Sequence, residues 1–513
     1  MKKYLYAIAV LFATIVFRAN AQYPLDIKAD YNWISGYGDY NPRPGGTSIL
    51  NFSGLPDTLY RSAGINISFS SASISDTAGN LILFTNGYTV YDSLFNKING
   101  ADSLSCCNLA FELNYSTGVR DIDCVLAIKT PGYENSYTII HKTIDLEASG
   151  TSNYSLTLLV SKIKHQNDTL IGINKNEIFF ADTVYPVGIE ACRHANGRDW
   201  WLIQKHDKIN KFWVFLFDPS GIHLINTQLL PGKVPDYYTQ TVFSPNGEKF
   251  IIAGAHSILN DSMFIAKFDF DRCTGLLSNP EYYKFKPSFG PPGSGAAISP
   301  DSKMLYISYP IEIFQFDISQ PNWKQTKQIV ATYDGFKDTI QNTPLGTVFT
   351  FMQLAPDNKI YIAGGNTRYL HTIENPNVSG TACNVSQHSI KLPSIHDRTI
   401  SNFPNYRLGP IDGSPCDTLG IDNITNISTL LDNNQEPVKL YPNPATDYIT
   451  LFVPRITKQW QFALYDIQGR EVLHVHSRGA FRSINIAHLA QGMYLWKLVY
   501  EDGKQENGKV VKQ

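Results

Sequence analysis

The stretch Thr241-Val-Phe-Ser-Pro-Asn-Gly-Glu-Lys-Phe-Ile-Ile252 contains two short apolar runs separated by a polar reversal. Proline presets the φ angle of a tight turn, and an Asn side chain at such a position bonds its own backbone. The second run is apolar at consecutive positions, which is typical of a strand buried on both faces. The stretch therefore predicts two antiparallel strands joined by a tight turn.

The same strand–turn–strand pattern occurs at four other places, over residues 72–84, 194–203, 296–307 and 352–362. Turn residues Asn246 and Ser302 lie 56 positions apart, as do Ser302 and Asn358. A recurrence of about 50 residues is the spacing of four-stranded blades in a β-propeller. Strands that end in aspartate are expected after three of the units, over residues 212–218, 263–269 and 313–317.

Residues Phe243-Ser-Pro-Asn-Gly247, Ile298-Ser-Pro-Asp-Ser302 and 268–275 resemble the exported Bacteroidota β-propellers that are related to WD-repeat and quinoprotein-like folds. Two weaker units, 133–140 and 31–38, bring the expected number of blades to about seven over residues 22–417. The N-terminal unit is expected to close the ring against residues 402–408, because closure removes exposed sheet edges. Two separate β-sandwich domains are the alternative.

Composition supports an all-β chain and excludes some classes of partner. Of the 513 residues, 17% are charged and 12% are aromatic, with 36 Gly and 28 Pro, and no long helical periodicity occurs. The net charge of −2 provides no basic surface for nucleic acid. We therefore expect no nucleic-acid partner and no polybasic membrane patch.

The C-terminal stretch Tyr441-Pro-Asn-Pro-Ala-Thr-Asp447 precedes short alternating strands separated by turn residues, which predicts a small Ig-like β-sandwich. Residues 437–513 resemble the type A C-terminal sorting domain of the type IX secretion (Por) system. The resemblance implies interaction with the type IX secretion machinery, passage across the outer membrane and attachment to surface lipopolysaccharide. An ordinary Ig-like module is the alternative. The residues that carry the sorting motif are Tyr441, Pro442, Asn443, Pro444, Gly469, Gly492, Tyr494 and Gly508.

The N-terminus predicts export. Two lysines precede an apolar run of about 14 residues, and Ala19-Asn-Ala21 supplies the small-x-small cleavage pattern of a signal peptide over residues 1–21. An uncleaved anchor is the alternative, although the run is short for a membrane span. We expect no transmembrane segment in the mature chain, a linker over residues 418–436, and delivery through the periplasm to the cell surface or the medium.

Seven cysteines in an exported chain favour disulfides, and the odd count leaves at least one thiol unpaired within the chain. We expect Cys106 or Cys107 to pair with Cys124, and Cys383 to pair with Cys416. No Cys-x-x-Cys motif is present. No metal site and no cofactor are predicted.

The common catalytic motifs of hydrolases, metalloproteases and nucleotide-binding enzymes are absent. The strongest polar cluster is His194, Arg198 and Asp199, where His194 could act as a general base. Alternatively, the His194 ring bonds Asp199 or Asp218 as in WD-type repeats, and the strand-terminal aspartates form turns. Trp33 and Tyr37 suit contact with a glycan or a protein, but Trp33 also suits a core. We expect a non-enzymatic binding or scaffold protein; an extracellular hydrolase or lyase acting on glycans or peptides is the alternative.

Overall fold

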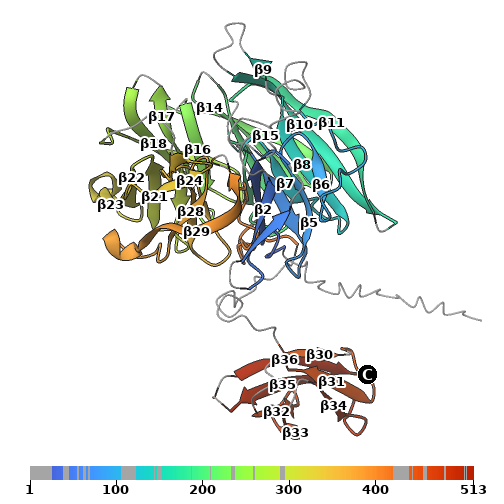
Figure 1. Ribbon diagram of the computed structural model, residues 1–513. Coiled ribbons are helices and arrows are strands. Elements are labelled where there is room, and N and C mark those ends of the chain that lie inside the picture. Colours follow the sequence, from blue (N-terminus) through green and yellow to red (C-terminus); the bar gives the residue numbers. More distant parts are fainter. Residues whose placement is uncertain are drawn as a thin grey trace, which may run out of the picture. The chain divides into compact units, whose positions relative to one another are not determined.

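The computed structural model divides into two compact units, Met1–Thr425 and Asn426–Gln513 (Figure 1). All strand pairs in the described sheets are antiparallel, and the described helices are two 3₁₀ turns, η1 (Trp323–Thr326) and η2 (Gly380–Cys383). The predicted signal peptide and most of the predicted linker lie outside the described residues. The structure describes residues 26–37, 46–54, 57–61, 65–67, 70–105, 123–143, 145–146, 153–167, 169–185, 188–207, 209–232, 237–257, 260–288, 295–396, 398, 400–419, 438–441, 443–453, 459–478, 481–501, 503 and 505–513.

Seven sheets of three to five strands make up most of the described part of the first unit. The first two sheets are β1 (Asn32–Tyr37), β2 (Gly46–Asn51) and β3 (Asp57–Arg61), then β4 (Ala72–Ser75), β5 (Leu81–Thr85) and β6 (Val90–Asp92). The third contains β7 (Leu126–Lys129), β8 (Ser136–Lys142), β9 (Asp145–Leu146), β10 (Asn153–Gln166) and β11 (Thr169–Val184). The fourth contains β12 (Glu190–Arg193), β13 (Trp200–Lys205), β14 (Lys211–Asp218) and β15 (Gly221–Leu229).

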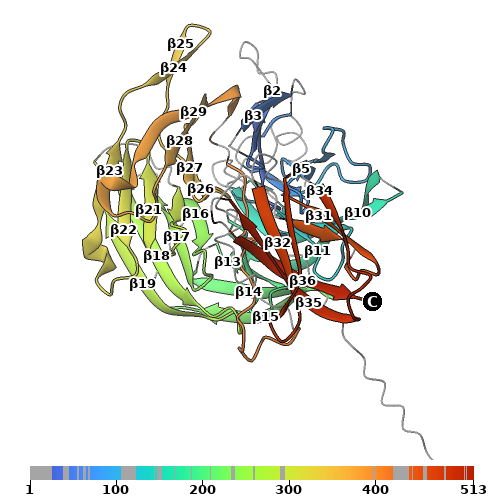
Figure 2. The same cartoon turned by 90° about the horizontal axis from the view of Figure 1, so that it is seen from below.

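The fifth sheet contains β16 (Tyr237–Phe243), β17 (Lys249–Ser257), β18 (Asn260–Phe270) and β19 (Leu277–Phe285). The sixth contains β20 (Ala296–Ile298), β21 (Met304–Tyr309), β22 (Glu312–Asp317) and β23 (Gln328–Thr332). The seventh contains β26 (Met352–Leu354), β27 (Ile360–Ala363), β28 (Thr367–Ile373) and β29 (Val385–His396), and the hairpin β24 (Lys337–Ile340) and β25 (Thr343–Gly346) precedes it. Neighbouring strands follow chain order in each sheet except the third, where β8 pairs directly with β10 and the short β9 also pairs with β10. The sheets succeed one another around the unit (Figure 2).

The predicted turns join the first two strands of their sheets. In the turn between β16 and β17, Ser244 Oγ accepts a hydrogen bond from Lys249 N at 2.9 Å, and Gly247 has a φ of +74°. Ser302 and Asn358 adopt the same left-handed conformation in the equivalent turns, which short polar residues tolerate. The local pattern thus sets these reversals, and the strands expected over residues 212–218, 263–269 and 313–317 are confirmed as β14, β18 and β22.

Residues 400–411, which we call the axial segment, bind the first strands of several sheets. Asn402 donates from its backbone N to Ser71 O at 2.9 Å, beside β4. Its side-chain Nδ2 donates to Val125 O at 3.4 Å and to Ile189 O at 3.2 Å, beside β7 and β12. One asparagine therefore meets the innermost strands of three consecutive sheets.

The residues on either side of Asn402 reach two further sheets. Ile34 N in β1 donates to Ser401 Oγ at 3.2 Å, and Gln353 Nε2 in β26 donates to Phe403 O at 3.4 Å. The remaining innermost strands are linked by Gln240 of β16. Its side chain accepts from Ala296 N in β20 at 2.9 Å and donates to Met352 O in β26 at 2.8 Å. First strands from all seven sheets thus converge on one small region.

The expected meeting of residues 31–38 with residues 402–408 is confirmed as a contact, because the Trp33 and Phe403 rings lie 6.0 Å apart. The contact is not a strand pairing, since none of residues 400–411 is in a strand. Instead, individual side-chain and backbone groups of the axial segment form separate hydrogen bonds to different sheets. A segment that contacts several sheets in turn cannot keep the regular hydrogen-bond register of a strand.

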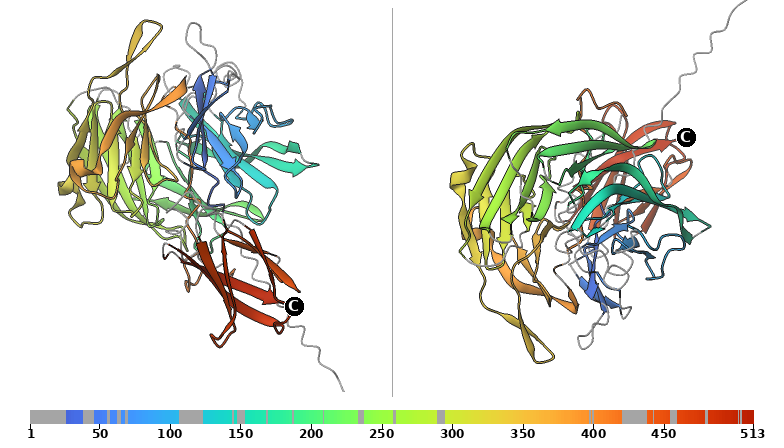
Figure 3. Two further views of the ribbon diagram at one scale, coloured as in Figure 1. Left: turned by 60° about the horizontal axis from the view of Figure 1, so that its bottom comes forward. Right: turned by 90° about the horizontal axis from the view of Figure 1, so that it is seen from above.

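The second unit is a two-sheet sandwich with one shared core. One sheet contains β30 (Lys439–Tyr441), β31 (Tyr448–Phe452) and β34 (Phe481–Asn485). The other is ordered β33 (Glu471–Arg478), β32 (Gln459–Tyr465), β35 (Gly492–Tyr500) and β36 (Gln505–Lys512). Side chains from both sheets alternate into the core, among them Ile449, Phe462 and Leu498. Figure 3 shows this unit in red in two views.

Gly508 provides a direct test of the packing in this sandwich. It lies opposite Trp496, and a Cβ atom at Gly508 would be 2.7 Å from the indole ring. Gly508→Val is therefore expected to lower the free energy of unfolding of this unit by about 1–3 kcal/mol, as over-packing does. Thermal unfolding of the full chain measures the effect, with Asn507→Ala on the exposed side of β36 as the control. Equal unfolding temperatures for Gly508→Val and the wild type would contradict this packing.

Candidate functional site

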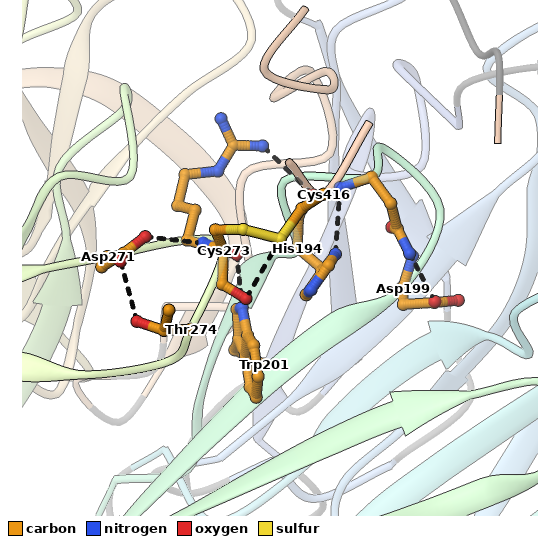
Figure 4. The surroundings of a disulfide bond; sticks show 9 residues. His194, Asp199, Trp201, Asp271, Cys273, Thr274 and Cys416 are labelled. Carbon is orange, nitrogen blue, oxygen red and sulfur yellow. Dashed lines mark hydrogen bonds between the residues drawn. A yellow bond between two sulfur atoms is a disulfide. The ribbon is translucent and has the colours of Figure 1, made fainter. Parts of the chain in front are cut away.

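The turn between β12 and β13 contains the three polar residues that the sequence singles out. His194 N donates to Asp199 O at 2.8 Å, so these two residues close the turn through their backbones. His194 Nδ1 accepts from Asn196 N at 2.9 Å, and the ring packs against Trp201 with centroids 5.1 Å apart (Figure 4). The predicted bond from the His194 ring to Asp199 or Asp218 is wrong. Nδ1 already accepts from Asn196 N, and the ring makes its other hydrogen bond with the Cys273 backbone.

Asp199 is held by its own turn. Arg198 Nε donates to Asp199 Oδ1 at 2.7 Å and Arg198 Nη2 to Asp199 Oδ2 at 3.0 Å, while Asn196 Nδ2 donates to the same Oδ2 at 2.6 Å. Burial lowers the pKa of His194, so its ring is neutral at pH 7. The structure thus brings His194, Arg198 and Asp199 together, but their polar atoms are used to hold the turn.

The disulfide beside this turn differs from the predicted one. Cys416 pairs with Cys273, at a Cα–Cα distance of 5.6 Å (Figure 4). Cys383 is a buried free thiol. The predicted Cys383–Cys416 bond is therefore wrong. The cause is tertiary: the chain after the axial segment returns to the loop that follows β18, which is 143 residues earlier. The predicted partners Cys106 and Cys107 lie outside the described residues.

The aromatic residues predicted for binding are not both available. Trp33 is buried, with its ring against Phe52, Tyr361 and Phe403 at centroid distances of 5.0, 5.5 and 6.0 Å. The core alternative is therefore correct for Trp33. The Tyr37 side chain lies outside the described part of the chain, so its predicted role stays a prediction.

A buried cluster of ionisable groups lies close to the axial segment, and the sequence analysis missed it. Asp123 comes two residues before Val125, and Glu190 directly follows Ile189, whose carbonyl groups accept from Asn402. Asp123 O accepts from Ile189 N at 2.8 Å. Lys142 Nζ donates to Tyr185 O at 2.9 Å, and all three charged side chains are buried. No local sequence signal distinguishes this cluster, because β12 reads Glu-Ala-Cys-Arg and carries a charged residue at each end.

Burial decides the protonation of both carboxyl groups. It raises the pKa of Asp123 to about 7, although the Lys142 ammonium opposes this change. Burial raises the pKa of Glu190 well above its usual value, and the nearby Asp123 charge raises it further. A carboxyl group with a pKa of about 7, as at Asp123, is partly protonated at neutral pH and can donate a hydrogen bond or a proton at this position.

The pKa of Asp123 makes stability depend on pH. The folded chain binds this proton more tightly than the unfolded chain, so the stabilisation is complete below pH 3.8 and is lost as the pH rises to about 7. Asp123→Asn is expected to remove this loss of stability at higher pH. From pH 5 to pH 7.5, the variant should lose about 2–3 kcal/mol less unfolding free energy than the wild type. Denaturant unfolding measures the difference, with exposed Asp412→Asn as the control. Parallel pH profiles for Asp123→Asn and the wild type would contradict the raised pKa.

A buried serine–histidine contact was also missed. Ser105 Oγ lies 2.9 Å from His141 Nδ1, and His141 Nε2 lies 3.0 Å from Ser161 Oγ. Burial lowers the pKa of His141 to about 3, which makes it a poor base at neutral pH. We therefore interpret the contact as a core hydrogen-bond network. No local sequence motif distinguishes it.

Among the described residues, no group of three or more His, Cys, Asp or Glu side chains could hold a metal ion, and no helix has the length and apolarity of a membrane span.

The sorting-motif residues that the structure describes build the second unit. Asn443 lies against the outer edge of β36: its Nδ2 donates to Lys509 O at 3.1 Å, and its Oδ1 accepts from Val511 N at 2.9 Å. Ala445 N then donates to Val511 O, so Pro444 lies between two residues that close this edge. Tyr494 is buried, and its hydroxyl donates a hydrogen bond to Ala490 O. Gly469 occupies a turn with φ +80°, Gly492 begins β35, Tyr441 ends β30, and Pro442 lies outside the described residues.

Residues 439–513 match the family model of the secretion system C-terminal sorting domain. These residues are a type IX secretion sorting tail. The tail implies export to the cell surface or the extracellular space and contact with the type IX machinery. No curated protein matches the chain.

Solved structures resemble the chain only distantly. A protein provisionally named 6-phosphogluconolactonase from Bacteroides fragilis is 12% identical, with 72% of this chain and 98% of that chain covered and a TM-score of 0.43. A protein of the same provisional name from Bacteroides uniformis is 13% identical, with 71% and 98% covered and a TM-score of 0.43. PorZ of Porphyromonas gingivalis, a surface component of the type IX secretion system, is 11% identical, with 92% and 73% covered and a TM-score of 0.30. These likenesses decide neither fold nor activity.

Proposed function

We propose that residues 22–417 form a seven-bladed, WD-repeat- or quinoprotein-like β-propeller of a Bacteroidota cell. After removal of signal peptide 1–21, the type IX system delivers it to the surface or the medium, where attachment to lipopolysaccharide retains it. There it binds a protein or glycan ligand without catalysis. The seven meandering sheets in chain order support the propeller, and the tail at residues 439–513 supports the route.

The axial segment supports the proposal that the protein binds a ligand without catalysis. Asn402 and its neighbours bond to the first strands of two sheets and to residues directly before the first strands of three more, so the chain itself occupies the place where a propeller enzyme would bind substrate. His194 and Asp199 are held in a turn. A rigid ring with a filled axis presents its loops and rim for recognition.

An extracellular hydrolase or lyase is the second candidate. The observation that favours it is the buried pair Asp123 and Glu190, since burial raises the pKa of both carboxyl groups. A carboxyl group that titrates near pH 7 is suited to general acid catalysis.

One experiment distinguishes the two. The purified mature chain is incubated with an array of glycans and matrix proteins, and both retention and released products are measured. Retention without products supports the binding role. Product release that is lost in Asp123→Asn but kept in Asp412→Asn supports catalysis at the buried pair and contradicts the binding role.

A further inference from the structure

The outward face of the sheet β33-β32-β35-β36 carries a contiguous apolar patch. Met493 on β35 and Val511 on β36 are direct cross-strand partners, and Leu495 lies two residues along the same face. Their side chains are 47%, 36% and 49% exposed, respectively. Tyr465 on β32 lies opposite Leu495 and extends the patch across a third strand. The intervening residues Tyr494 and Trp496 point into the core, so the exposure is confined to one face.

The sorting motif leaves this face, rather than the adjoining strand edge, open for recognition. Backbone groups along the outer edge of β36 are already bonded by Asn443 and Ala445. Gln513 N donates to Ala445 O and extends this closure to the C-terminal residue. A partner strand therefore cannot be added there without displacing the motif.

Charge indicates what the patch binds. Lys509 lies directly opposite Leu495, and Lys497 follows two residues later on the same face. Neither lysine has a carboxylate partner among the described residues. Residues 439–513 contain ten Lys and Arg but six Asp and Glu, although the whole chain has a net charge of −2. A partner surface with an apolar centre and carboxylates at its rim complements this arrangement.

We propose that the face formed by Met493, Leu495 and Val511, with Lys497 and Lys509 beside it, is the surface by which the sorting tail docks on an acidic-rimmed protein of the secretion machinery. The inference rests on the proposed export route. The motif residues build the sandwich and close its edge, whereas this face makes the contact.

The test follows export of the full chain in a bacterium that has a type IX system. The docking variant is Met493→Thr/Leu495→Thr/Val511→Thr, because threonine keeps strand propensity while removing apolar surface. The matched control is Tyr448→Thr/Ile467→Thr, at two exposed apolar residues away from this face. A chain ending at residue 438 tests the route itself. The docking variant should reduce the exported fraction about tenfold or more, and the control should export as the wild type does.

The outcomes separate the two proposals. Normal export of the chain that ends at residue 438 would overturn the export route. If the chain that ends at residue 438 is retained in the cell while the docking variant is exported normally, the docking face is overturned and the export route stands. If the docking variant unfolds at a lower temperature than the control, Lys497→Glu/Lys509→Glu replaces it, and normal export of that variant overturns the proposal. A wild-type dimer in sedimentation that the docking variant dissolves would reassign the face to self-association and would also overturn it.

Discussion

Arg407→Met is expected to lower the free energy of unfolding of the first unit by about 3–5 kcal/mol, the usual effect of leaving one charge of a buried pair without its partner. Arg407 Nη1 and Nη2 donate to Asp30 Oδ1 and Oδ2 at 2.8 and 2.7 Å. Nη1 also donates to Ile27 O at 3.1 Å. Asp30 is buried, so its carboxylate cannot recover a hydration shell while the fold persists.

The ion pair matters because of what it joins. Arg407 belongs to the axial segment, and Asp30 lies just before β1. Tyr406 beside it is buried and donates its hydroxyl proton to Ala127 O in β7 at 2.7 Å. Losing Arg407 therefore weakens the contact between the two ends of the first unit.

Denaturant unfolding of the full chain measures this prediction. Lys303→Met is the matched control, because the Lys303–Asp301 pair is exposed and such pairs contribute about 0–1 kcal/mol. Asp30→Asn combined with Arg407→Met should recover part of the loss, since the double variant leaves no uncompensated charge. An Arg407→Met chain as stable as the control would show that the buried pair does not hold the axial segment.

Replacing the disulfide cysteines by serine, Cys273→Ser/Cys416→Ser, is expected to lower the free energy of unfolding by about 2–4 kcal/mol. The bond joins residues 143 positions apart, so its removal releases a long loop in the unfolded chain. It also ties the chain just after the axial segment to the loop that follows β18.

Thermal unfolding with and without reductant provides the measurement and its control. Reductant should lower the unfolding temperature of the wild type to that of the serine variant and leave the variant unchanged. A wild type that is unaffected by reductant, with all thiols accessible after unfolding, would mean that the bond does not form.

Turns and strands that are determined by residues close together in the chain were predicted correctly from the sequence. Ser-Pro-Asn-Gly turns are set by proline, a short polar side chain and a glycine within four residues, and the turn at Gly247 formed as expected. The same holds for β31 of the second unit, where buried Ile449 and Leu451 lie on either side of Thr450. A local pattern was sufficient for these elements.

The candidate site was harder to predict because its contacts join distant parts of the chain. Cys416 pairs across 143 residues, and no spacing distinguishes Cys273 from Cys383 as its partner. Trp33 was a candidate for binding, but it is buried against Phe403, which is 370 positions later in the chain. Asp123 and Glu190 belong to no motif, and only the packing of several sheets makes them neighbours of the axial segment.

Hydrogen exchange at residues 400–411 of the full chain tests whether the axial segment fills the axis of the proposed ring. Asn402 N and Ile411 N donate to Ser71 O and Ala195 O in the folded unit. We expect peptides covering this segment to exchange as slowly as peptides from β13 and β14, over hours. Exchange within seconds, while the strands stay protected, would show that the axial segment leaves the axis open and would contradict this expectation.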